Sequence, residues 1–80
     1  MSLENPQKNR DQKYYTDLVS EIRTILPKDL EIPLVIKQVI DFIEAGMPEK
    51  AVNKFKWDRD KLLFEYDFKE VIELLKNKLL

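Results

Sequence analysis

Paired carboxylates are the side chains of this sequence whose spacing comes closest to acid–base chemistry. Asp41 with Glu44, and Glu70 with Glu73, lie three residues apart, so each pair shares one face of a helix. Carboxylates at this spacing are also ordinary solvated helix charges, and we interpret them in that way. The triplet Asp58-Arg59-Asp60 has too few oxygen ligands for calcium and no glycine at the bend, so we interpret Asp58 as a capping or turn residue.

Most catalytic mechanisms lack their usual residue types here. The chain contains neither histidine nor cysteine, which removes the commonest general base, the thiolate nucleophile and the main zinc ligands. Its one glycine cannot build a phosphate-binding loop. Ser2 and Ser20 have no nearby base in the pattern of a hydrolase. We therefore expect a protein that is not an enzyme, with no cofactor, no metal and no evident small-molecule substrate.

A local excess of basic residues suggests a second kind of chemistry, the binding of nucleic acid. Aromatic residues are interleaved with these cations, so phosphates could meet the cations while a base stacks on a ring. Asp58 and Asp60 cancel part of this charge, and the lysines can equally form a solvated helix face with the aromatic residues in the core. The candidate nucleic-acid-binding residues are Lys50, Lys54, Lys56, Arg59 and Lys61.

The stretch IDFIEAGMPEKAVNKFKWDRDKL, residues 40–62, resembles a generic helix-turn-helix unit. In that family a helix ends at a glycine, a short helix follows, and a recognition helix opens after a polar cap. The resemblance implies apolar anchors at Phe55, Trp57 and Leu62 and a cap at Asp58, with Arg59 and Lys61 beginning the recognition helix. It implies a DNA-binding transcriptional regulator, which we keep as the alternative function.

Apolar and aromatic residues are concentrated in the C-terminal third, where five of the eight aromatic residues fall between Phe55 and Phe68. Core packing accounts for part of this excess, but a chain of 80 residues has a limited interior. Large amphipathic side chains dominate the binding energy of protein interfaces. The leading prediction is therefore a small regulatory or adaptor protein that binds another protein or a second copy of itself, through Trp57, Phe64, Tyr66, Leu75, Leu79 and Leu80.

These residues need helices to position them, and the apolar spacing predicts a mainly α bundle of four to five short helices. A first helix over 8–26 would start at Asn5-Pro6 and stop before Pro27. A second over 34–45, apolar around much of its circumference, would be central and end at Gly46. A third would begin at Pro48, and a last one over 68–80 would be capped by Asp67, with Glu70 in a capping box.

The segment 54–66 admits two interpretations. As a helix, it would be capped by Asp58, with Leu62, Leu63 and Tyr66 facing inward. As a β-hairpin with its loop at residues 58–61, it would place Trp57 opposite Leu62, which makes the fold α+β. The alternation of apolar and charged residues over 64–68 favours the hairpin, whereas the flanking helical patterns favour the helix.

The composition is that of one small globular domain over residues 1–80, with 1–7 as a mobile tail. The chain is 44% hydrophobic and 36% charged, and its formal net charge of −1 provides no global attraction to nucleic acid or to an anionic membrane. Residues 1–13 contain no apolar run of signal-peptide length. We therefore expect a cytoplasmic protein with no membrane association.

Overall fold

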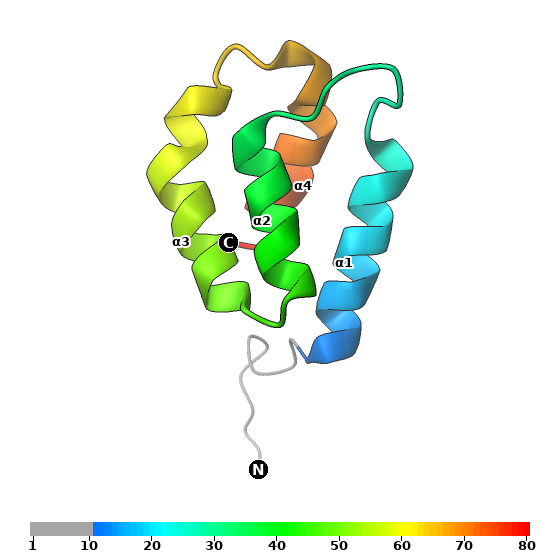
Figure 1. The fold of residues 1–80 in the computed structure, drawn as a ribbon, viewed down its shortest axis with the longest axis vertical. Helices are drawn as coiled ribbons and strands as arrows, with labels where there is room; N and C mark the ends of the chain where they lie inside the picture. Colours follow the sequence, from blue (N-terminus) through cyan, green and yellow to red (C-terminus); the bar gives the residue numbers. More distant parts are fainter. Residues whose placement is uncertain (1–10) are drawn as a thin grey trace.

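The computed structural model describes residues 11–80, which contain four α-helices and two short 3₁₀ helices and no β-strand (Figure 1). The mainly α bundle is thus confirmed, and the β-hairpin alternative is wrong. The elements in chain order are α1 (Gln12–Ile25), α2 (Leu34–Glu44), α3 (Pro48–Asp58), η2 (Arg59–Leu62), η3 (Tyr66–Phe68) and α4 (Lys69–Lys78).

The helices alternate in direction, and α2 lies between α1 and α3 with α4 behind it (Figure 1). The segments 26–33 and 59–68 therefore lie together at the end of the bundle where α1 and α3 finish, which we call the apical end. The turn between α2 and α3 lies at the opposite, basal end. The packing of η2 against α2 agrees with this arrangement, because η2 directly follows α3 and the two helices are antiparallel.

Helix α1 begins at Gln12 because Asp11 caps it: the Asp11 carboxylate accepts a hydrogen bond of 3.0 Å from the Tyr14 N–H. The predicted start at Asn5-Pro6, residues 8–10 of the predicted helix and the predicted tail over 1–7 lie outside the described residues. The helix ends one residue before the predicted Leu26, which is extended (ψ 132°) as expected of a residue that precedes proline.

Helix α2 matches the predicted range to within one residue, and its end is fixed by Gly46. The glycine has a φ of +78°. Its N–H donates to Ile43 O at 3.1 Å, and the Met47 N–H donates to Phe42 O at 2.8 Å, which is the Schellman pattern of hydrogen bonds. Helix α3 then starts at Pro48 as predicted, because proline costs no hydrogen bond at the first helical position.

One continuous apolar core joins all four helices. Phe55 is its largest fully buried side chain, and α2 contributes more buried residues than any other described helix, in agreement with its predicted central place. The buried residues are Leu18, Val19, Ile22, Leu26, Val35, Ile36, Val39, Ile40, Ile43, Ala51, Phe55, Leu62, Phe68, Val71, Leu75 and Leu79.

The start of α4 differs from the prediction. Asp67 makes no capping hydrogen bond, because Tyr66–Phe68 form a 3₁₀ turn that leads directly into α4 at Lys69. The Lys69 N–H donates to Tyr66 O inside this turn, and the residue at the cap position is Phe68, which has no side-chain acceptor. The capping box of Asp67 and Glu70 is therefore corrected to a 3₁₀ entry.

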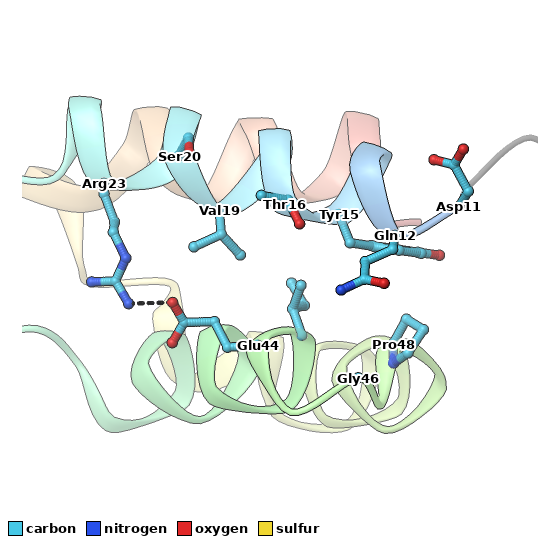
Figure 2. Close-up of a pocket in the computed structure, with 11 residues that line it drawn as sticks. Asp11, Gln12, Tyr15, Thr16, Val19, Ser20, Arg23, Glu44, Gly46 and Pro48 are labelled. Carbon is cyan, nitrogen blue, oxygen red and sulfur yellow. Dashed lines mark hydrogen bonds and ion pairs between the residues drawn. The ribbon is translucent and has the colours of Figure 1, made fainter.

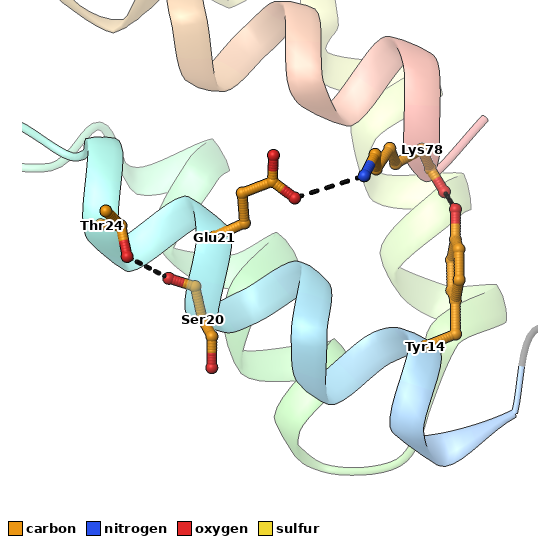
Figure 3. Close-up of polar contacts among 5 residues, drawn as sticks. All are labelled: Tyr14, Ser20, Glu21, Thr24 and Lys78. Atoms are coloured by element: carbon orange, nitrogen blue, oxygen red, sulfur yellow. Dashed lines mark hydrogen bonds and ion pairs between the residues drawn. The ribbon is translucent and has the colours of Figure 1, made fainter.

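Polar contacts hold the end of α4 to α1 (Figure 3). The Tyr14 hydroxyl, in the first turn of α1, donates to the main-chain carbonyl of Lys78, and the Lys78 ammonium lies 3.3 Å from the Glu21 carboxylate. These contacts place the last turn of α4 beside the first half and the middle of α1, and Figure 1 shows that the chain ends near the middle of the bundle's height. Within α1, the Thr24 hydroxyl donates to the Ser20 carbonyl at 2.9 Å.

Candidate interaction surface

Large apolar side chains in contact with solvent are concentrated at the apical end. Among residues 11–80, eight large hydrophobic side chains are exposed, and six of them lie on the apical connections or on the helix turns beside them. Of the other two, Met47 lies in the basal turn, and Leu80 is the last residue of the chain, which ends near the middle of the bundle's height (Figure 1). We call the six the apical surface: Leu30, Leu34, Trp57, Leu63, Phe64 and Tyr66.

Three aromatic residues dominate this surface. Trp57 is 83% exposed, Phe64 78% and Tyr66 75%. Each side chain therefore forgoes most of the stabilisation that burial provides, which is about 25 cal/mol per Å² of apolar area. All three fall within ten residues of the chain, from the last turn of α3 to the first residue of η3. This segment therefore carries the three most exposed large hydrophobic side chains of the described residues.

The local structure explains why these residues point outward. Phe55 faces the core, and a residue two positions later in a helix lies about 200° around the axis, so Trp57 is on the opposite face of α3. After α3 the chain tightens into η2, whose Leu62 is buried, and then turns. Leu62 and Phe68 anchor the two ends of the connection in the core, which leaves the residues between them on the outside.

The predicted interaction residues divide into two groups. Trp57, Phe64 and Tyr66 lie together on the apical segment, whereas Leu75 and Leu79 are buried in the chain's own core, so these two are corrected from contact residues to core residues. Leu80 is 38% exposed and lies at the C-terminus, away from the apical end. The apolar face of α4 thus packs in the core of its own chain.

The prediction missed three members of the apical surface, Leu30, Leu34 and Leu63. Leu63 was expected to face inward on a helix, but α3 ends at Asp58 and Leu63 lies in the turn after η2, where it is 64% exposed. Leu34 opens α2 after Pro33 and is exposed. A sequence signal for Leu34 does exist, since the buried residues of α2 lie at 35, 36, 39, 40 and 43, a helical spacing that leaves out position 34.

Charge pairing reduces the basic character of the segment 50–61. The Asp58 carboxylate lies 2.5 Å from the Lys54 ammonium and 3.6 Å from that of Lys61. The hydrogen bond from Lys54, followed by the nearby positive charges, lowers the pKa of Asp58 below 3.8, although partial burial opposes this shift. Two of the five candidate cations are therefore engaged within the chain, and Lys50, Lys56 and Arg59 are exposed.

The segment that would be the recognition helix of a helix-turn-helix unit is not an α-helix. Arg59–Leu62 form a single 3₁₀ turn, and Leu63 and Phe64 lie in a following turn. Asp58 closes α3 and makes no side-chain capping hydrogen bond. Of the three anchors, Phe55 and Leu62 are buried whereas Trp57 is exposed.

A groove of about 690 Å³ runs between α1 and the turn that joins α2 to α3 (Figure 2). Its apolar floor is formed by Val19, Ile43 and Pro48, and the ion pair of Arg23 with Glu44, 2.7 Å apart, lies at one end. Because this cation and this anion neutralise each other, the groove has no unbalanced charge from them to select a ligand. No set of three or more acidic residues between 11 and 80 is arranged to hold a metal ion.

Comparisons with family models, with curated proteins and with solved structures found no match to this chain. None of the helices in residues 11–80 combines the length and the apolar character needed to cross a bilayer.

Proposed function

We propose that this chain is a small protein-interaction module, a regulatory or adaptor protein that acts by binding and not by catalysis. The observation that supports it is the exposure of three aromatic side chains, each at least 75% accessible, within ten residues at one end of the bundle. Tryptophan and tyrosine are enriched among residues whose truncation costs most at interfaces. Contiguous apolar surface on a small protein is typical of a binding site.

The backbone of residues 62–68 is held in place by contacts within the chain, and this also supports a binding function. Leu62 and Phe68 are buried on either side of Leu63, Phe64 and Tyr66, and main-chain hydrogen bonds of 3.3 Å from Leu63 N to Asp60 O and 3.1 Å from Glu65 N to Leu62 O close the turns between them. A partner that covers these side chains therefore meets a backbone that is already ordered. Preorganisation of this kind lowers the entropic cost of association.

Site-specific photo-cross-linking tests this function. A benzoylphenylalanine would replace Phe64 in one variant and Leu80 in a control, since both residues are exposed but Leu80 lies at the C-terminus, away from the apical end. We expect protein adducts from position 64 under native conditions and few from position 80. Equal yields from both positions, or no adduct from position 64, would contradict the proposal.

The DNA-binding alternative has less support. Its exposed cations outside the ion pairs of Asp58 are Lys50, Lys56 and Arg59, and the charge of Asp60 next to Arg59 opposes the approach of phosphate there. We therefore expect no retardation of duplex DNA, even at low salt, where contacts to phosphate are strongest. Retardation that weakens steeply with salt, and that is lost in Arg59→Gln, would instead establish the alternative.

A further inference from the structure

The apical surface is large enough for a stable protein interface. Each aromatic side chain can bury about 150–250 Å², so three that are 75–83% exposed offer roughly 350–600 Å². The exposed leucines at positions 30, 34 and 63 add to this area. The total approaches the roughly 800 Å² that each partner contributes to a standard interface. A short linear motif would cover only part of it.

The charges around the apical surface indicate which partner fits. Residues 58–61 read Asp-Arg-Asp-Lys, and across 58–69 the acidic Asp58, Asp60, Glu65 and Asp67 stand beside the basic Arg59, Lys61 and Lys69. Such a mixture does not select a strongly basic or strongly acidic partner. A surface with the same mixture can match it, because in a two-fold contact a residue away from the axis meets a different residue of the other copy, so that acidic groups can face basic ones.

The charge of the whole chain permits self-association. A formal net charge of −1 gives little repulsion between two copies. The other exposed large apolar side chains of the described residues, Met47 in the basal turn and Leu80 at the C-terminus, lie away from the apical end and would not compete for the contact. We infer that the apical surface is covered by a second copy of this chain, in an apex-to-apex two-fold dimer; this inference rests on the proposed binding function.

Sedimentation equilibrium of the full chain tests this inference. We expect a species of twice the 9.6 kDa chain mass in the parent protein. Phe64→Glu, which places a charge in the contact, should weaken association by at least about 30-fold. The control Leu80→Glu places the same charge at an exposed leucine away from the apical end and should leave the dimer unchanged. Circular dichroism of the helices identifies any variant that has lost the fold. If Phe64→Glu has lost it, Tyr66→Ser is measured in its place.

A parent chain that remains monomeric at submillimolar concentration overturns the inference, as does a dimer that dissociates in Leu80→Glu but not in Phe64→Glu. Binding of a monomeric parent to anionic vesicles also overturns it. The proposed function and the dimer are tested separately. If the chain is monomeric but still cross-links a different protein from position 64, the proposed function stands and only the second copy is ruled out as the partner.

Discussion

Gly46 is the one glycine of the chain and adopts a φ of +78° between α2 and α3. Side chains with a Cβ pay a conformational cost in this left-handed region, whereas glycine does not. This is why the helix end at Gly46 was predictable from sequence: the requirement concerns the residue's own backbone and depends little on tertiary contacts. The resulting turn sets α3 antiparallel to α2 and so carries the end of α3 to the apical end.

Gly46→Ala should destabilise the fold by about 1 kcal/mol. A Cβ at this position would meet no atom within 4 Å, so the loss is conformational and not steric. Gly46→Asn should cost less, because asparagine enters the left-handed region more readily. Urea unfolding of the three proteins measures the difference, and a larger loss in the asparagine variant would contradict this explanation.

Asp58 gives the chain a specific response to acid. Its pKa is lowered in the folded state, first by the hydrogen bond from Lys54, so its stabilising contribution is present above the unfolded value of 3.8 and is lost as the pH falls through the folded value. Asp58→Asn should flatten the decline of the urea midpoint in that range. The effect is small because the ion pairs lie near the surface; an unchanged acid profile would show that Asp58 contributes nothing.

At the scale of elements, α3 separates two aromatic residues that look alike in the sequence. Phe55 is fully buried, whereas Trp57, two residues later, is exposed. Both were compatible with a core, and the alternation over 64–68 suggested a hairpin that would pair their segment with the residues after its loop. In the structure Trp57 lies on the outer face of α3, and the turns around η2 keep Phe64 and Tyr66 outside.

Alanine substitution at these two positions should therefore give very different losses of stability. Phe55→Ala should cost about 3–5 kcal/mol through lost burial and a cavity, and Trp57→Ala should change the unfolding free energy by less than about 0.5 kcal/mol. Urea unfolding in dilute protein measures both without a contribution from self-association. Similar losses at the two positions would mean that the assignment of helix faces is wrong.

The elements differ in how far sequence could define them. The range of α2 and the start of α3 followed from proline, glycine and apolar spacing, which act locally. The role of Leu75 and Leu79 did not, because an apolar stripe looks the same whether it packs against its own chain or against a partner. Phe64 and Tyr66 were predicted as anchors, but their place at the same end of the bundle as Leu34 depends on the antiparallel packing of α2 with α3 and on the contact of η2 with α2.

At the scale of the whole molecule, the two ends of the bundle differ in character. At the basal end and along α1, polar contacts join this helix to α4 through Tyr14, Glu21 and Lys78 (Figure 3). The apical end presents six exposed large apolar side chains. Folding alone does not require this asymmetry, since the core residues of all four helices are already buried by the chain itself.

Fluorescence quenching of Trp57 tests the central claim most directly, because this is the only tryptophan of the chain and it lies on the proposed contact. In concentrated parent protein we predict that acrylamide reaches Trp57 poorly and that its emission is shifted to shorter wavelength. In Phe64→Glu at the same concentration, the indole should be fully quenchable. Equal quenching of Trp57 in the two folded proteins would contradict the claim that the apical surface is covered by a partner copy.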